Sequence, residues 1–249
     1  MLAAERHLKI IEIISETGSA QVEQLSKILD VSPMTIRRDL EKLQEGNMIE
    51  RCHGGAVMKQ EVNYFEKRKT HPGEKVKIAQ KSADYVKNGD TIFLDAGTTT
   101  YEIAKLIKNM QDLTVITNDI EIASLLKNSD VELLVCGGNM QKSTGGMYGL
   151  FANQMMENVR LNIGFFGAAS IDENFNVLTP TMDKVSFKRL VLKNCQRSFL
   201  VVDDSKFNRK ALLKINNFKD YTGVITNKIF TRKELKSLDE LGIRMITVK

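Results

Sequence analysis

"VSPMTIRRDL", residues 31–40, carries the strongest local signals in this 249-residue sequence. Ser32 is of the residue type that caps helices. Pro33 follows at the first helical position, where its missing N–H removes no hydrogen bond. Ile36 and Leu40 lie four positions apart, so they share one face of the helix. The stretch therefore predicts a helix that starts at Ser32 and buries the face with Ile36 and Leu40.

Two adjacent arginines, Arg37 and Arg38, occupy the first two turns of this helix. A helix N-terminus already carries partial positive charge, so cations there are mildly unfavourable. The arginines therefore indicate either a negatively charged partner or a simple solvent-exposed face.

Two further helices are predicted before this one, and the spacing between them is informative. The third helix is expected to end at Gly46-Asn47, and only "DVS", residues 30–32, separates it from the second. That separation is typical of a helix-turn-helix. The residues expected to point inward are Leu8, Ile11 and Ile14 in the first helix, Val22, Leu25, Ile28 and Leu29 in the second, and Ile36, Leu40 and Leu43 in the third.

A short hairpin is predicted directly after these helices. "MIERCHGGAVMK", residues 48–59, indicates two strands joined by a turn at Gly54-Gly55, which is the pattern of a wing. In a helix-turn-helix the second helix lies in the major groove, where hydroxyls contact phosphate and arginines contact phosphate or guanine. The wing would contact the backbone or the minor groove. The predicted DNA-binding residues are Ser32, Pro33, Met34, Thr35, Arg37, Arg38, Arg51, His53 and Gly54. A structural three-helix unit with a solvated arginine face is the alternative.

Net charge does not favour DNA binding by this first part. The whole chain has a formal charge of +5, but residues 1–60 hold eight Lys and Arg against nine Asp and Glu. Their net charge is −1, which leaves +6 for the remainder. Attraction to DNA must therefore depend on where the arginines lie.

The rest of the chain has a different pattern. Residues 59–74 are charged and contain Pro72-Gly73, which predicts a linker between residues 1–58 and a second domain at 75–249. From residue 75 onward, short apolar strands such as "TIFL" and "FLVV" alternate with helical stretches. This alternation predicts an α/β domain with a mostly parallel sheet covered on both faces. The fold class is therefore a two-domain α+β chain.

The predicted strand ends of the second domain carry a candidate anion site. The stretch 95–100, Asp-Ala-Gly-Thr-Thr-Thr, follows a strand and opens a helix. Ligands bind at this edge of parallel sheets, and helix N-termini favour anions. The candidate ligand-binding residues are Asp95, Gly97, Thr98, Thr99, Thr117, Asn118, Gly137, Gly138 and Lys206.

Other features exclude several classes of protein. The three cysteines are far apart and form no metal or disulfide pattern, which favours a reducing cytoplasm. No apolar run is long enough to span a membrane, and the first residues lack a signal-peptide core. We expect no metal, no cofactor and no membrane partner.

Residues 1–58 resemble the DNA-binding domain of the DeoR family of bacterial transcription regulators, through "VSPMTIRRDLEKL" and "RCHGGA". The resemblance continues through the second domain in "LDAGTTT", "VITN", "CGGN" and "DDSKF". It implies a fold similar to ribose-5-phosphate isomerase and CoA transferases. It also implies a phosphorylated-sugar effector, operator DNA as partner, and a repressor that is a homodimer or homotetramer. Asn162 and Lys184, beside Asp183, depart from the acidic residues of the family pattern and leave the exact effector open.

Two alternatives to a ligand-controlled repressor remain at this point. The second domain could be an isomerase-like enzyme that uses Asp95, Asp172 and Lys206 as base and donor groups. It could also serve only to hold subunits together, in which case no phosphosugar would bind.

Overall fold

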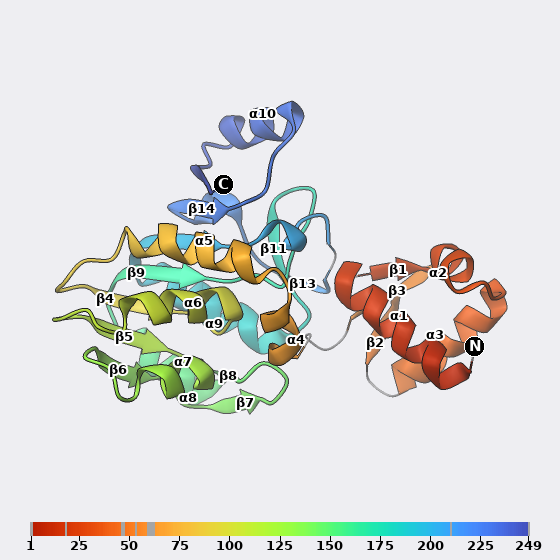
Figure 1. The fold of residues 1–249 in the computed structure, drawn as a ribbon, viewed down its shortest axis with the longest axis horizontal. Helices are drawn as coiled ribbons and strands as arrows, with labels where there is room; N and C mark the ends of the chain where they lie inside the picture. The colour runs from red at the N-terminus through yellow and green to blue at the C-terminus, as the bar shows by residue number, and fades with distance from the viewer. Residues whose placement is uncertain are drawn as a thin grey trace.

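The computed structural model describes residues 2–17, 19–45, 48–52, 54–58, 63–209 and 211–248. Figure 1 shows a smaller body at the N-terminus and a larger one formed by the rest of the chain. Three positions that the sequence singled out lie outside the described residues: Gly46, Asn47 and His53. The first four residues of the predicted linker, 59–62, lie outside them as well.

The smaller body is a three-helix unit with a small antiparallel sheet of order β1-β3-β2. The predicted helices and the wing hairpin are confirmed, and residues 30–32 separate the second and third helices as expected. Strand β1 was not predicted from the sequence, and it adds a third strand beside β3. The elements are α1 (Ala3–Thr17), β1 (Ser19–Gln21), α2 (Val22–Leu29), α3 (Pro33–Glu45), β2 (Ile49–Cys52) and β3 (Gly55–Met58).

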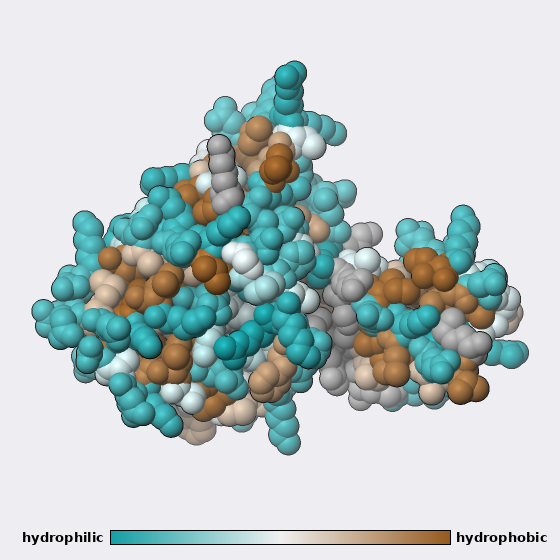
Figure 2. Space-filling view, viewed as in Figure 1, coloured by the Kyte–Doolittle hydropathy of each residue, from teal (hydrophilic) through white to brown (hydrophobic). Residues whose placement is uncertain are grey.

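The inward faces of α1 and α2 differ from the prediction at two positions. Leu8 and Ile28 are 68% and 63% exposed, so the prediction that they point inward was wrong. Ile14 is buried as expected, and Ile10, which was not predicted, takes the place of Leu8 in the core. Leu8 lies about 200° around the helix from Ile10, because each residue turns the helix by about 100°. Figure 2 shows patches of apolar residues on the visible face of the smaller body.

Both glycines of the wing turn have a structural reason. Gly54 has a φ of +80°, which L-residues with side chains rarely adopt. A Cβ at Gly55 would collide with the backbone oxygen of Ala20 in β1. The Gly-Gly pair therefore permits the tight turn and the close approach of β1.

The larger body is built on a seven-stranded sheet of order β15-β14-β12-β9-β4-β5-β6, in which every neighbouring pair is parallel. The predicted α/β domain is therefore confirmed. The strands are β4 (Thr91–Leu94), β5 (Thr114–Thr117), β6 (Glu132–Val135), β9 (Leu161–Phe166), β12 (Cys195–Val201), β14 (Gly223–Thr226) and β15 (Met245–Thr247).

Helices cover both faces of this sheet. One apolar cluster joins it to α5 (Pro72–Ala83), α6 (Thr98–Ile107) and α7 (Ile120–Leu126). A second cluster joins it to α8 (Leu150–Glu157), α9 (Met182–Lys193) and α10 (Arg232–Glu240). No helix in the described part of the chain is long and apolar enough to cross a membrane.

Smaller elements complete the larger body. The hairpin β7 (Asn139–Gln141) and β8 (Gly146–Tyr148) follows β6, and β10 (Ser170–Ile171), β11 (Asn176–Thr179) and β13 (Leu213–Asn217) form an antiparallel sheet. Two 3-10 turns are η1 (Asp204–Lys206) and η2 (Phe218–Asp220). Helix α4 (Tyr64–Lys69) and the start of α5 fall inside the range 59–74, which the charged composition led us to predict as a linker.

Candidate functional site

Helix α3 presents most of the predicted DNA-binding residues to solvent. Pro33, Met34, Arg37 and Arg38 are exposed, and Thr35 is half-buried. Ser32 is also exposed, and its hydroxyl accepts a hydrogen bond from the Thr35 amide at 3.2 Å, which caps the helix as the sequence predicts. Among the residues that the structure describes, no salt bridge involves Arg37 or Arg38. Both guanidiniums are therefore available to an anionic partner.

Asp39 holds α3 against α1, a role that the sequence reasoning missed. Its carboxylate accepts hydrogen bonds from Arg6 Nε at 2.6 Å and Arg6 Nη2 at 3.0 Å, and it lies 2.9 Å from His7 Nε2. Burial opposes ionisation of Asp39, but Arg6 and His7 outweigh it and hold the pKa of this carboxyl below its usual value. A signal was available, because position 39 falls three residues after buried Ile36 on the inward face.

The wing adds one described cation to this surface. Arg51 Nη1 lies 2.9 Å from Glu41 of α3, and both side chains are substantially exposed. An exposed pair of this kind is weak, so Arg51 can exchange Glu41 for a phosphate. Gly54 forms the tip of the wing.

A pocket lies at the carboxyl ends of β4, β9 and β12. The segment after β4 continues into α6 on one face of the sheet, whereas the chain after β9 leads to α9 on the other face. Ligands bind at such a switch point because the diverging connections leave a crevice. The lining residues are Lys67, Ala96, Gly97, Thr98, Thr99, Thr100, Gly167, Ala168, Ala169, Lys184, Lys188, Val201, Val202, Asp203 and Lys206.

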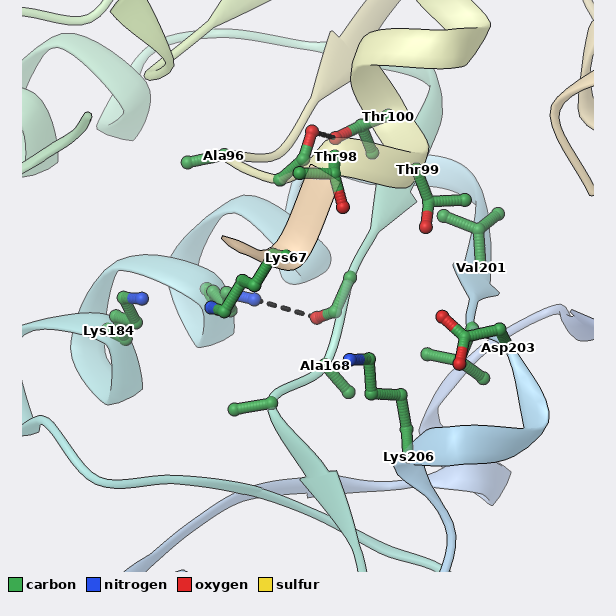
Figure 3. A pocket seen from close by; sticks show the side chains of 15 residues that line it. Lys67, Ala96, Thr98, Thr99, Thr100, Ala168, Lys184, Val201, Asp203 and Lys206 are labelled. Carbon is green, nitrogen blue, oxygen red and sulfur yellow. Dashed lines mark hydrogen bonds between the residues drawn. The ribbon is translucent and has the colours of Figure 1, made fainter. Parts of the chain in front are cut away.

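The predicted loop 95–100 forms one wall of this pocket. The Thr100 hydroxyl donates to the Asp95 carbonyl at 2.6 Å and closes the turn into α6. Figure 3 shows Thr98 and Thr99 across the pocket from Lys206. Gly97, Thr98, Thr99 and Lys206 are thus brought together, as the sequence predicts.

Two other predicted residues support this loop from behind rather than line the pocket. Asn118 Oδ1 accepts the Ala96 amide at 3.0 Å, and the Thr117 hydroxyl donates to the Leu94 carbonyl at 2.8 Å. Asp119, which was not predicted, accepts the Gly97 amide at 2.9 Å and caps α7. Burial raises the pKa of Asp119 to about 6, although its backbone hydrogen bonds oppose that shift.

Asp95 lies beneath the pocket and is already paired. Its Oδ2 is 2.6 Å from the ammonium of Lys188, and both side chains are buried. The same oxygen accepts the Gly167 amide at 2.9 Å, while Lys188 donates to the Gly167 carbonyl at 2.8 Å. Asp95 therefore joins the loops after β4 and β9 and fixes Lys188 at the pocket wall.

Lysines give the pocket its charge, and three of them were not predicted as site residues. Lys67 comes from α4, Lys184 and Lys188 come from α9, and Lys206 comes from η1. Burial lowers the pKa of Lys206 to about 8, while Asp203 opposes that shift. Lysines are ordinary surface residues, so no sequence signal separated these from the others.

Asp203 is the carboxylate that lines the pocket. Burial would raise its pKa, but Lys206, the Ser205 hydroxyl, Lys75 and His71 together hold it below the usual value. Its Oδ1 accepts the Ser205 amide at 3.0 Å, whereas its buried Oδ2 has no hydrogen-bond partner among the described atoms. Asp203 is therefore ionised at neutral pH, and one of its two oxygens is unpaired among the described atoms.

The remaining predicted positions lie away from the pocket lining. Gly137 and Gly138 are exposed and precede β7. Asp172 closes the turn between β10 and β11 by accepting the amides of Asn174 and Asn176, each at 2.9 Å. Asp95, Asp172 and Lys206 are therefore not assembled as an isomerase-like site would require. Asn162 accepts the amide of Thr91, the first residue of β4, so it lies at the opposite sheet edge.

One cluster has metal-ligand residue types. Ligand atoms of His71, Asp203 and Asp204 lie within 4.8 Å of one another. Lys206 and Lys75 also act on Asp203, and this positive surrounding opposes a bound cation.

Similarity to known proteins decides the family. A profile described as the DeoR-like helix-turn-helix domain matches residues 6–62, and one described as the DeoR C terminal sensor domain matches residues 70–228. The chain belongs to the DeoR family. The predicted resemblance is thereby confirmed over nearly the whole chain. A DeoR-family member with both domains is a DNA-binding transcription regulator with a sensor domain.

Curated relatives of this DeoR-family chain are named as regulators. The glycerol-3-phosphate regulon repressor of Escherichia coli is 34% identical over 91% of this chain and 92% of its own length. The repressor of the same name from Haemophilus influenzae is 32% identical over 90% of this chain and 89% of its own. The HTH-type transcriptional regulator GlpR of Haloferax volcanii is 30% identical over 99% of this chain and 98% of its own. The protein is therefore a transcription regulator and not an enzyme.

Solved structures with a similar fold include ribose 5-phosphate isomerase A from Methanocaldococcus jannaschii, with 17% identity and a TM-score of 0.42 over 55% of each chain. Another is eIF2B delta from Chaetomium thermophilum, with 15% identity and a TM-score of 0.47 over 92% of this chain and 72% of the other.

Proposed function

We propose that this chain represses an operon for sugar transport or catabolism, and that a phosphorylated sugar or sugar-alcohol phosphate controls its binding to the operator. The observation that carries the proposal is the pocket at the strand ends, which combines four lysines with the N-terminus of α6. It lies in a chain whose other domain presents two exposed arginines on a helix of the groove-binding type.

The charge of the pocket suits one phosphate monoester. Four ammonium groups, from Lys67, Lys184, Lys188 and Lys206, face two carboxylates, Asp95 and Asp203, which leaves an excess of two positive charges. A phosphate monoester carries about −1.5 to −2 at pH 7. The amides at the start of α6 and the hydroxyls of Thr98 and Thr99 supply further donors for its oxygens.

The sugar end of the ligand is assigned to Asp203. Its buried Oδ2 has no partner among the described atoms, so it can accept a hydroxyl from a polyol. Asp95 is a weaker candidate for that role: its Oδ2 is taken by Lys188 and the Gly167 amide, and although its buried Oδ1 also has no partner among the described atoms, Asp95 does not line the pocket. The two relatives named as glycerol-3-phosphate regulon repressors support a small sugar-alcohol phosphate as one candidate effector.

We also propose that two copies of the DNA-binding domain act together on one operator. The first domain carries almost no net charge, so its affinity must come from a few local contacts and from the pairing of two copies on a two-fold operator. We assign that pairing to residues 75–249, as an even-numbered homo-oligomer.

Titration calorimetry tests the sensor role. The full chain is titrated with glycerol 3-phosphate, ribose 5-phosphate and fructose 6-phosphate, and with glycerol, ribose and fructose. At least one phosphorylated compound should bind and its free form should not. Lys206→Ala and Thr98→Ala should weaken that binding, whereas Lys236→Ala, on the exposed face of α10 with an 80% exposed side chain, should not. Equal binding of the phosphorylated and free forms would contradict the site. Absence of any binding would favour a second domain that only holds subunits together.

A further inference from the structure

Helix α4 is the first described element after the DNA-binding domain, and it also reaches the pocket. Only residues 59–63 separate it from strand β3 of the wing. Its Lys67 lines the pocket together with Lys206 and the start of α6. Any ligand that contacts Lys67 therefore touches the segment that leads directly to the DNA-binding domain.

Several contacts hold α4 on α6. Tyr64 is 4% exposed, and its ring meets that of Tyr101 edge-on at a centroid distance of 6.4 Å. The guanidinium of Arg68 lies 4.7 Å from the centroid of the Tyr101 ring. The Tyr64 amide also donates to the Ser143 carbonyl at 2.8 Å, in the turn between β7 and β8. Because α6 opens the pocket with its N-terminus, α4 rests on an element of the site itself.

The other end of α4 is held by a buried lysine. The Lys75 side chain is buried, and its ammonium donates to the Lys67 carbonyl at 2.6 Å and to the Thr70 carbonyl. Lys75 also interacts electrostatically with Asp203, which lines the pocket beside Lys206. The end of α4 and the charged groups of the pocket thus belong to one electrostatic cluster.

We propose that Lys67 is a ligand of the effector's phosphate and that its contact couples effector binding to the DNA-binding domain by fixing α4 in its docked position. The proposal rests on the function proposed above. A ligand shifts an equilibrium only when it binds one conformation better than another. The Lys67 contact supplies that difference, because it exists only while α4 is docked. The docked state is then the state of low operator affinity.

The test uses the full chain with three variants and glycerol 3-phosphate as the first probe, replaced by whichever phosphosugar of the panel binds best. Lys67→Met removes the ammonium and keeps most of the stem. Lys69→Met is the matched control, because Lys69 lies on the same helix, is 73% exposed and pairs with Glu66. Tyr64→Ala removes the anchor of α4 without changing a pocket-lining residue.

Two quantities are measured: operator affinity with and without saturating probe, and hydrogen exchange of the amides of residues 63–70. In the wild type and in Lys69→Met the probe should slow exchange in α4 and reduce operator affinity by about tenfold or more. In Lys67→Met and Tyr64→Ala the reduction should shrink to less than about twofold at saturating probe. If Lys67→Met no longer binds the probe, Tyr64→Ala alone tests whether docking of α4 couples probe binding to operator affinity.

A full wild-type response in Tyr64→Ala, or in probe-saturated Lys67→Met, would overturn the coupling role. Unchanged exchange of α4 in the probe-bound wild type would overturn it as well. Failure of the proposed function is distinct: the probe then binds the wild type, slows α4 exchange and leaves operator affinity unchanged, or no phosphosugar binds at all.

Discussion

Replacing Asp39 by alanine is expected to destabilise the DNA-binding domain without touching a residue assigned to DNA. Asp39 belongs to the same "TIRRDL" string as Arg37 and Arg38, but its side chain is only 6% exposed and faces α1. Its loss leaves the Arg6 guanidinium, itself only 12% exposed, without its carboxylate. The substitution therefore separates support of the helix from contact with DNA.

The magnitude follows from the geometry. Asp39 accepts two hydrogen bonds from Arg6, at 2.6 and 3.0 Å, and lies 2.9 Å from His7 Nε2. Removing one partner of a buried ion pair costs about 3–5 kcal/mol. Arg6 lies near the start of α1 and can turn towards water, so we expect a loss of about 3 kcal/mol in the free energy of unfolding of this domain. Glu41→Ala on the same helix breaks only an exposed pair and should cost less than about 1 kcal/mol.

Hydrogen exchange followed by mass spectrometry reports this domain separately within the full chain. Peptides from α1 and α3 should lose about 3 kcal/mol of protection in Asp39→Ala, while peptides from β4 and β9 should not change. The chain has no tryptophan, so far-UV circular dichroism gives the independent unfolding curve. A loss below about 1 kcal/mol would refute the reasoning, because the pair would then contribute no more than a surface ion pair.

The same pair gives a sign for the pH dependence. The pKa of Asp39 is lower in the folded state than the usual carboxyl value of about 3.9. The contribution of ionised Asp39 to the stability of the domain is therefore complete above that value, and it is lost as the pH falls through the lowered pKa. Protection of α3 in the wild type should fall towards that of Asp39→Ala in acid, and parallel curves at all pH values would contradict the assignment.

Three further outcomes are expected. Arg38→Ala should weaken binding to a selected operator by about 1–3 kcal/mol per DNA-binding domain, whereas Arg37→Ala should weaken binding to scrambled duplexes as well. Unchanged operator affinity of Arg38→Ala in fluorescence anisotropy titrations would contradict the assignment of α3 to the major groove. Because the pKa of Lys206 is about 8, affinity for the phosphosugar should fall from about pH 7 to about pH 9, and calorimetry should show proton uptake on binding near pH 8. An affinity that does not change over this pH range would contradict a contact between the phosphate and the Lys206 ammonium. Gly138→Ala should lower the free energy of unfolding by about 1–3 kcal/mol, because the φ of Gly138 is +137° and a Cβ there would collide with the Tyr148 carbonyl. A Cβ at Gly137 would meet open space, so Gly137→Ala should leave stability unchanged, and equal melting temperatures of the two variants would contradict this expectation.

Local sequence patterns predict much of the fold. The capping serine, the proline and the apolar spacing of α3 identify its start and its buried face, and Ile36, Leu40 and Leu43 are all buried as expected. The alternation of short apolar strands with helices likewise predicts a parallel sheet, because such strands must be covered on both faces. These are short-range regularities, and a single sequence displays them directly.

Contacts between distant segments were harder to predict. Asp95 and the Gly167 amide are 72 positions apart, and only the folded sheet brings them together with Lys188. The sequence therefore suggested Asp95 as a lining residue, whereas the structure puts it below the pocket. Lys67 was assigned to a charged linker because its neighbours are polar, yet buried Tyr64 anchors that segment on α6.

The central claim is that a phosphorylated small molecule in the strand-end pocket controls operator binding. The most direct measurement is the affinity of the full wild-type chain for an operator selected from a random duplex pool. It is made without ligand, with the phosphosugar that binds best, and with the matching free sugar. We predict that the phosphosugar lowers operator affinity by about tenfold or more and that the free sugar has no effect. The same affinity in all three conditions would contradict the claim.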